Sequence, residues 1–134
     1  VDVAIFSAAV SDFKVKEKKN QKIKKEEYIN LNLEKNVDIL NYVSNHNSLR
    51  PKLVIGFAAE TNNIKNNATK KLAEKNCDWL IANDVSNKSI GFESDYNEVI
   101  ILYKNKKINY EKLSLKKKSD ISDEIVDRVI SHLN

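Results

Sequence analysis

The sequence predicts an α/β domain built on a mainly parallel sheet, with flanking helices and an antiparallel addition towards its C-terminal end. Three observations lead to this prediction. Short apolar runs alternate with segments of helical periodicity along most of the chain. Several of these runs lack polar alternation, which is typical of parallel strands covered on both faces. Two further apolar segments around residue 100 flank a short polar turn, which indicates a hairpin.

The first third of the chain is expected to hold a buried strand, a loop, a half-buried strand and a helix. Residues 3–9 are continuously apolar or small, as in a central parallel strand, whereas residues 28–33 alternate apolar and polar side chains. Residues 37–47 have mostly helical spacing, with Asn36 as the expected N-cap. Residues 14–27 lack apolar periodicity and are expected to form a mobile lysine-rich loop.

The remaining elements follow in a Rossmann-like order. They are strand 53–57, helix 63–76, strand 79–82, a hairpin of 98–103 and 108–113, and helix 119–133 with Ser119 as its N-cap. No linker or composition shift divides them, so residues 1–134 are expected to form a single domain. Nucleotide-binding sheets of this kind usually open on a glycine-rich turn, and the chain has only two glycines. Either lysines hold the phosphate in this chain, or the glycine-rich half lies upstream of residue 1 and the domain is truncated at its N-terminus.

Composition narrows the class of protein. No apolar run reaches the roughly 20 residues of a membrane helix, so no membrane partner is expected. The single cysteine, Cys77, fits a reducing cytoplasm. The net charge is +4, and the stretch 14–27, with seven lysines and three glutamates, accounts for all of it. One basic strip favours local capture of phosphate over a broad nucleic-acid surface, although a general bias towards lysine and asparagine would also produce it.

Polar residues follow three of the predicted strands, where ligands bind in doubly wound sheets. Asp12 follows the first strand, Glu60 and Thr61 follow the strand 53–57, and Asn83 and Asp84 follow the strand that begins at Trp79. Small residues precede them and would let a ligand approach closely. Turn and cap chemistry is the alternative explanation, above all for Asn83 and Asp84.

Lysines supply the candidate phosphate contacts. Lys22 lies on the basic strip, and a lysine on a loop can follow a phosphate and exclude water as the loop closes. Lys71 and Lys75 are spaced i,i+4 and share one helix face. Such a pair suits a polyphosphate, but the spacing alone fits a solvated face better.

Taken together, these segments resemble the synthetase domain of the bacterial bifunctional enzyme phosphopantothenoylcysteine decarboxylase/synthetase. The matching stretches, in order, are residues 8–13 (AAVSDF), 22–25 (KIKK), 33–40 (LEKNVDIL), 56–62 (GFAAETN), 71–75 (KLAEK), 82–86 (ANDVS) and 92–97 (FESDYN). The resemblance spans nearly the whole chain, and the order and spacing of the short motifs make it specific.

The resemblance implies a ligase that joins 4′-phosphopantothenate to L-cysteine with CTP, through an acyl-cytidylate and with loss of pyrophosphate. The residues that would hold CTP are Phe6, Asp12, Lys22, Glu34, Lys35, Asn36, Val37, Phe57, Lys71 and Lys75. Lys22 would also be catalytic, because its charge would neutralise the transferring phosphoryl group. The resemblance further implies Mg²⁺ with the nucleotide, a homodimer, and FMN only in a decarboxylase half that these residues do not include.

Two departures from the family pattern stand out. Val37 replaces a proline after the asparagine of the turn, and the glycine-rich first half, with its catalytic asparagine, is absent from these residues. The active site is therefore expected to be incomplete in this fragment. Two alternatives remain, namely a non-catalytic module that binds nucleotides or nucleic acid through the lysine-rich strip, and an inert domain that keeps the motifs as relics.

Overall fold

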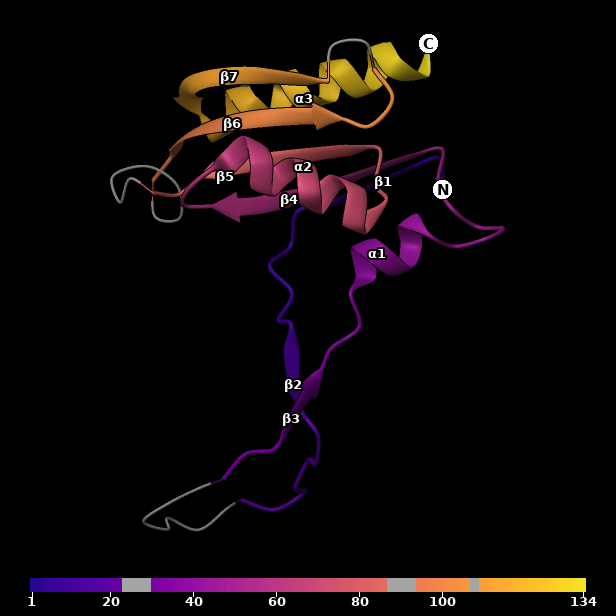
Figure 1. Ribbon diagram of the computed structural model, residues 1–134, viewed down its shortest axis with the longest axis vertical. Helices are drawn as coiled ribbons and strands as arrows, with labels where there is room; N and C mark the ends of the chain where they lie inside the picture. The colour runs from indigo at the N-terminus through magenta and orange to yellow at the C-terminus, as the bar shows by residue number, and fades with distance from the viewer. Residues whose placement is uncertain (23–29, 87–93, 107–108) are drawn as a thin grey trace.

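A five-stranded mixed sheet forms the body of the computed structural model, which describes residues 1–22, 30–86, 94–106 and 109–134 (Figure 1). Its strands, in spatial order, are β1 (Val3–Phe6), β4 (Leu53–Glu60), β5 (Trp79–Asp84), β6 (Tyr96–Tyr103) and β7 (Tyr110–Lys117). The first three run parallel, and β6 and β7 add antiparallel pairings. The predicted α/β class, with a parallel part and an antiparallel addition, is confirmed.

Helices cover both faces of this sheet and define two cores. Helices α1 (Ile39–Ser44) and α2 (Ile64–Lys75) lie on one face, where Ala68 and Leu72 pack against the strands. Helix α3 (Lys118–Leu133) covers the opposite face through Ile121, Ile125 and Val129, which pack around Trp79 and its neighbours. None of the described helices has the length and apolar character needed to cross a bilayer.

The apolar runs predicted the central strands well, because these strands are buried on both faces. Leu53, Val54 and Ile55 of β4 are fully buried, as are Ile81 and Ala82 of β5. Next to them lies the free thiol of Cys77, and its burial raises the pKa to about 11. The structure extends both strands to Glu60 and Asp84, because the parallel pairing continues to the register Glu60↔Asp84.

Strand β1 differs from the prediction of a central strand over residues 3–9. It ends at Phe6 and pairs with β4 alone among the described strands, which places it at the edge of the sheet. The side chain of Ile5 is 45% exposed. Helix α3 packs on β6 and β7, at the other end of the sheet, and so leaves this position uncovered.

A narrow two-stranded arm projects from the body (Figure 1). It consists of β2 (Phe13–Val15) paired antiparallel with β3 (Leu33–Lys35), in the register Phe13↔Lys35 to Val15↔Leu33. Residues 14 and 15 lie in β2 rather than in the predicted loop, and the described residues 30–32 of the predicted strand 28–33 are not strand, so both predictions are wrong at these positions. The described strand lies at residues 33–35, where β2 offers a partner. Residues 23–29 lie outside the described residues, so a mobile loop there stays a prediction.

Two predicted helix caps are also wrong. Asp38, rather than Asn36, is the N-cap of α1, and its Oδ1 accepts a hydrogen bond from Asn41 N at 2.9 Å. Helix α3 starts at Lys118, directly after β7, so Ser119 lies in its first turn. Pairing of Tyr96 with Lys117 prolongs β7 up to the helix and leaves no room for a separate cap residue at Ser119.

Candidate functional site

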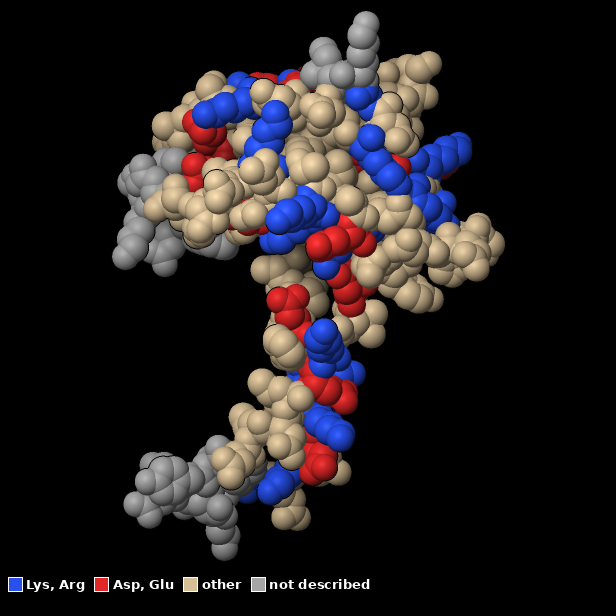
Figure 2. Space-filling model, in the orientation of Figure 1, with Lys and Arg blue, Asp and Glu red and all other residues tan. Residues whose placement is uncertain are grey.

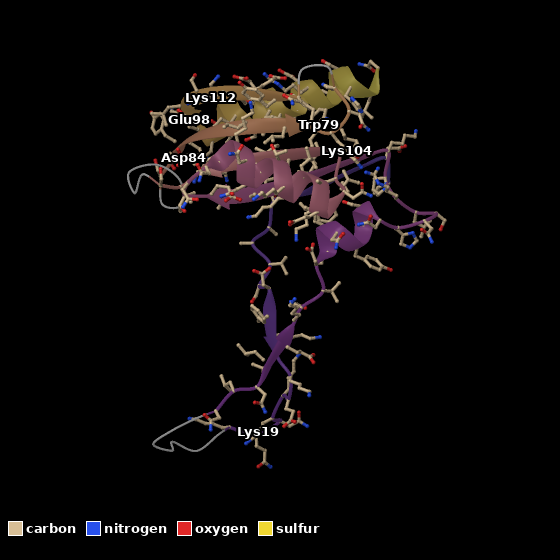
Figure 3. The ribbon with its side chains drawn as sticks, in the orientation of Figure 1. Lys19, Trp79, Asp84, Glu98, Lys104 and Lys112 are labelled. Atoms are coloured by element: carbon tan, nitrogen blue, oxygen red, sulfur yellow. The ribbon has the colours of Figure 1, made fainter. Side chains whose placement is uncertain are left out.

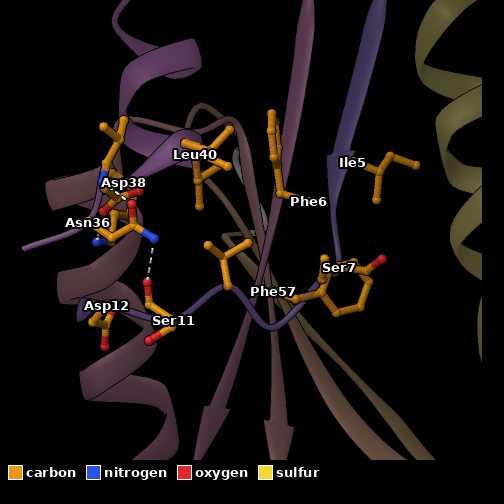
Figure 4. Close-up of a pocket in the computed structure, with 14 residues that line it drawn as sticks. Ile5, Phe6, Ser7, Ser11, Asp12, Asn36, Asp38, Leu40 and Phe57 are labelled. Atoms are coloured by element: carbon orange, nitrogen blue, oxygen red, sulfur yellow. Dashed lines mark hydrogen bonds and ion pairs between the residues drawn. The ribbon is translucent and has the colours of Figure 1, made fainter. Parts of the chain in front are cut away.

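A cleft of about 480 Å³ lies at the carboxyl end of β1, next to α1 (Figure 4). The segment that follows β1, the turn before α1, and side chains from β4 and α2 line it. The lining residues are Ile5, Phe6, Ser7, Ala8, Val10, Ser11, Asp12, Asn36, Val37, Asp38, Ile39, Leu40, Phe57 and Lys75. Its position at the carboxyl end of a parallel strand is the usual one for a ligand site in an α/β sheet.

Hydrogen bonds fix the two segments at the base of the arm. The Asn36 side-chain amide donates to Ser11 O at 3.1 Å, and Asn36 N donates to Asp12 O at 2.8 Å (Figure 4). Asn36 Oδ1 in turn accepts from Val37 N at 3.0 Å. These bonds hold the turn before α1 against the segment after β1. They therefore fix the distance between these two segments, which form two sides of the cleft.

Apolar side chains form much of the cleft wall. Phe6 and Phe57 come from neighbouring strands and contribute two aromatic rings, Phe6 on the side of the α1–α2 core and Phe57 on the side of the α3 core. Leu40 of α1 approaches Gly56 so closely that a Cβ at Gly56 would lie 2.5 Å from Leu40 Cδ2. The missing side chain at Gly56 therefore lets α1 sit directly on the sheet. A largely apolar cleft with a few polar groups is typical of a small-molecule site.

The charged groups of the cleft are Asp12, Asp38 and Lys75. Lys75, in the last turn of α2, donates a hydrogen bond to Asp38 Oδ2. Partial burial opposes ionisation of Asp38, but the hydrogen bonds from Lys75 and Asn41 N outweigh it and hold the pKa of this carboxyl below its ordinary value. Asp38 is therefore a carboxylate at neutral pH and neutralises Lys75.

One turn earlier on α2, Lys71 makes a similar ion pair outside the cleft lining. Its Nζ lies 2.7 Å from Oε1 of Glu60, whose side chain is only 9% exposed. The Asn67 amide donates to Glu60 Oε2 at 3.3 Å. Lys71 is thus paired with a carboxylate at the end of β4, and Lys75 with the carboxylate that caps α1. The interpretation of this helix face as purely solvated is wrong.

The structure brings together part of the predicted nucleotide-binding set. Phe6, Asp12, Asn36, Val37, Phe57 and Lys75 all line the cleft, whereas Lys22, Glu34, Lys35 and Lys71 do not. Glu34 and Lys35 belong to β3 in the arm, where Glu34 pairs with Lys14 at 3.3 Å. The sequence motif is continuous, but the chain leaves the arm after Lys35 and reaches the cleft only at Asn36.

Lys22 lies in the exposed segment that follows β2, and the described part of that segment ends with it. Figure 3 shows Lys19 of the same segment at the end of the arm furthest from the sheet. In Figure 2, acidic side chains alternate with the basic ones along the arm. On the face shown, the described part of the arm therefore has no continuous basic surface of the kind that binds nucleic acid.

The polar residues at the end of β5 lie outside the cleft lining. Asp84 Oδ1 accepts hydrogen bonds from Ser86 N at 2.9 Å and from Ser86 Oγ at 2.6 Å, which is local turn chemistry. These bonds lower the pKa of Asp84 below its ordinary value. Asn83 Oδ1 is buried without a partner among the described residues. This geometry fits the explanation that Asp84 is a turn residue rather than a ligand-binding one.

Several cleft residues were missed by the sequence reasoning. Asp38 is the most consequential, and its position one residue before an apolar helical segment was a usable N-cap signal. Ser7, Ser11 and Leu40 carry no comparable signal, because their roles depend on the path of the chain after β1 and on the seating of α1. Within the described residues, no group of three or more His, Cys, Asp or Glu side chains is placed to hold a metal ion.

Comparison with known families identifies the chain. A family model described as the DNA/pantothenate metabolism flavoprotein C-terminal domain matches residues 1–133. The chain belongs to this family. Among curated members, the Coenzyme A biosynthesis bifunctional protein CoaBC of Haemophilus influenzae is 40% identical over 129 residues, which cover 96% of this chain and 31% of that protein. The protein of the same name from Bacillus subtilis is 38% identical over 129 residues with the same coverage. The chain thus spans less than a third of the length of these relatives.

Solved structures of the family support the fold. The crystal structure of the C-terminal domain of a Coenzyme A biosynthesis bifunctional protein CoaBC matches with a TM-score of 0.71 and 34% identity, over 99% of this chain and 55% of that chain. The DNA/pantothenate metabolism flavoprotein from Streptococcus pneumoniae matches with a TM-score of 0.68. At 21% identity this second likeness is evidence for the fold alone.

Proposed function

We propose that the chain is the part of a coenzyme A biosynthesis ligase that binds CTP and helps to join 4′-phosphopantothenate to L-cysteine. One observation carries the proposal. Residues that the sequence motifs assign to the nucleotide come from β1, the turn before α1, β4 and α2, and they line one cleft. The match to the family and the names of its relatives add support.

In this proposal each kind of side chain in the cleft has a distinct task. Phe6 and Phe57 offer apolar surface to the nucleoside, while Asn36 keeps the two sides of the cleft in position. Lys75 contributes the positive charge for the phosphates, with Lys71 next to it on α2. Asp12 is available to accept hydrogen bonds from the nucleotide or to contact its counter-ion.

The proposed reaction proceeds in two balanced steps. A carboxylate oxygen of phosphopantothenate attacks the α-phosphorus of CTP, and the bond from that phosphorus to the bridging oxygen of the β-phosphate breaks, so pyrophosphate leaves with the electron pair. The amine of cysteine then attacks the acyl carbon, loses a proton, and releases CMP as the amide bond forms. Lys22 would stabilise the first step by neutralising charge on the transferring phosphoryl group.

The donor set bears on the proposed Mg²⁺. Magnesium usually takes one or two carboxylates from a protein and its remaining oxygen ligands from phosphates and water. Asp38 is committed to Lys75 and Asn41, which leaves Asp12 as the uncommitted carboxylate of the described lining. The cleft therefore fits a Mg²⁺ ion that arrives on the triphosphate and takes Asp12 as its protein ligand, whose charge it would then offset.

The homodimer and the cytoplasmic location are also proposals. On the arm, the side chains of Phe13 and Leu33 are 53% and 57% exposed. A two-stranded ribbon is marginally stable in water by itself, so apolar side chains of this kind are consistent with a surface that a second copy covers. FMN has no role in the residues of this chain under the proposal.

An assay of nucleotide choice tests the function. The natural full-length protein is incubated with phosphopantothenate, cysteine and CTP, ATP, GTP or UTP in turn, and pyrophosphate release is measured. We expect CTP to give the highest kcat/KM, with release that depends on phosphopantothenate. Equal rates with ATP would contradict the assignment of CTP but keep the ligase, whereas no release with any nucleotide would contradict the ligase itself.

A further inference from the structure

Both lysines on the inner face of α2 are held by carboxylates from other elements. Lys75 donates to Asp38, at the N-cap of α1, and Lys71 lies 2.7 Å from Glu60, at the end of β4. Two ion pairs at i,i+4 spacing on one helix are more than a chance surface contact, because each connects α2 to a different element. The cations expected to meet polyphosphate are thus already neutralised in the free protein.

Asp38 is the more informative of the two carboxylates, because it lines the cleft itself. Its Oδ1 is bound by Asn41 N at 2.9 Å, so the cap fixes the carboxylate and leaves Oδ2 for Lys75. One lysine and two aspartates are the charged residues among the lining residues, which gives a net lining charge of −1. A polyphosphate that enters the cleft therefore meets a lysine with a prior partner.

An interaction that exists only in the free state weakens the binding of any ligand that has to break it. The apparent dissociation constant rises by the inverse of the fraction of protein in which the binding group is available. For Lys75, that fraction is the population in which the ammonium has left Asp38. Removing the competing charge without disturbing the fold should therefore tighten the binding of polyphosphates.

We propose that Asp38 is a positioning residue that competes with phosphate oxygens for Lys75 and so keeps the affinity for pyrophosphate low. The ligand class is a polyphosphate anion, and its identity as the nucleotide and its pyrophosphate product rests on the proposed function. By competing, Asp38 favours release of pyrophosphate after the first step. In the free protein it keeps the long side chain of Lys75 at the cleft wall.

The substitution Asp38→Asn separates charge from structure. Asparagine is as good an N-cap as aspartate, so the hydrogen bond from Asn41 N is retained while the negative charge is lost. Binding of inorganic pyrophosphate to the natural full-length protein is measured by calorimetry. We expect Asp38→Asn to bind about tenfold more tightly, equivalent to ~1.4 kcal/mol. A purely structural role for Asp38 predicts weaker or unchanged binding, and that result would overturn the proposal.

Two further variants show whether the effect acts through Lys75. In a Lys75→Met background, Asp38→Asn should change pyrophosphate affinity by less than about twofold, by the non-additivity expected of interacting residues. A persistent gain there would mean direct repulsion between Asp38 and the ligand, and would overturn the competition. Glu98→Gln is the matched control, since Glu98 pairs with Lys112 at 2.6 Å away from the cleft (Figure 3). An equal gain in this control would mean that total charge is responsible, which would also overturn the competition.

The measurement of pyrophosphate binding needs no CTP, so the two proposals fail separately. If the protein turns over CTP but Asp38→Asn does not bind pyrophosphate more tightly, the competition is wrong and the ligase stands. If Asp38→Asn does bind pyrophosphate more tightly, through Lys75, but no nucleotide is turned over, the competition stands and the proposed function is wrong.

Discussion

Lys22 belongs to the arm, whereas Lys75 belongs to the cleft, although the sequence motifs assign both to the same nucleotide. A side chain on a helix that packs against the sheet has a position set by the core. A side chain on the exposed segment after β2 has none of those constraints. A catalytic role for Lys22 therefore requires the arm segment and the nucleotide to come together when the ligand binds.

Replacing Lys22 tests that role. Lys22→Ala should cost at least ~2.7 kcal/mol of transition-state stabilisation, which is about a hundredfold in kcat, because the ammonium acts on charge that develops at the phosphoryl group. Steady-state pyrophosphate release with CTP measures it. Lys18→Ala, from the same exposed segment, is the control and should change kcat by less than about threefold. Similar losses in both variants would mean that the segment supplies only diffuse charge.

At the scale of elements, α1 depends on its neighbours for stability. It has six residues, too few for an isolated helix in water. Its cap at Asp38, the pair with Lys75 and the contact of Leu40 with Gly56 hold it on the sheet. Because α1 and the turn before it form one side of the cleft, whatever moves α1 also changes the site.

The substitution Gly56→Ala should therefore affect stability and ligand binding together. Its Cβ would lie 2.5 Å from Leu40 Cδ2 and 3.1 Å from Leu80 Cδ1, so Leu40 must shift. We expect the free energy of unfolding to fall by about 1–3 kcal/mol, as for other overpacked cores, and the KM for CTP to rise. Urea unfolding and steady-state kinetics measure the two effects. Adding Leu40→Ala should recover part of the stability, and a failure to do so would exclude the clash as the cause.

Elements that depend on local pattern were predictable, and those that depend on tertiary pairing were not. Strands 53–57 and 79–82 and helix 63–76 carry continuous apolar or amphipathic signals, which survive because each is buried in the body. The arm strands β2 and β3 are three residues each and gain their structure only from each other. No periodicity can be read from three residues, so the sequence pointed instead to the longer alternation at 28–33.

At the scale of the whole molecule, the arrangement of strands in the sheet determines which site residues could be predicted from the sequence. Ends of neighbouring strands meet at one edge, and two of the three predicted strand ends, those with Asp12 and Phe57, line the cleft, whereas Asn83 and Asp84 do not. Lys71 was assigned to the nucleotide by the family resemblance, since helix spacing gives a face but not the distance along the helix to a ligand. The cap at Asp38 was assigned to Asn36 because both residue types are good caps, and in the structure it is the Asp38 side chain that accepts from Asn41 N.

A polar network secures the antiparallel end of the sheet, away from the cleft. Tyr103 donates to Glu111 at 2.5 Å, and the Arg128 guanidinium donates to the same carboxylate at 2.9 and 3.0 Å. This network joins β6, β7 and α3. Partial burial opposes ionisation of Glu111, but these hydrogen bonds outweigh it and hold its pKa below the ordinary value. The cleft and this end of the sheet are therefore stabilised by separate sets of residues.

The burial of Cys77 makes the chain its own reporter of unfolding. With a pKa of about 11, on the order of 0.03% of this thiol is ionised to thiolate at pH 7.5, against about 9% for a free cysteine. Its side chain is also 0% exposed. A disulfide reagent such as Ellman's should therefore modify this thiol only when the core between α2 and the sheet opens. The colour should develop slowly in buffer, at a rate that rises with urea along the unfolding curve. Modification as fast as that of free cysteine in native buffer would contradict the packing described around this thiol.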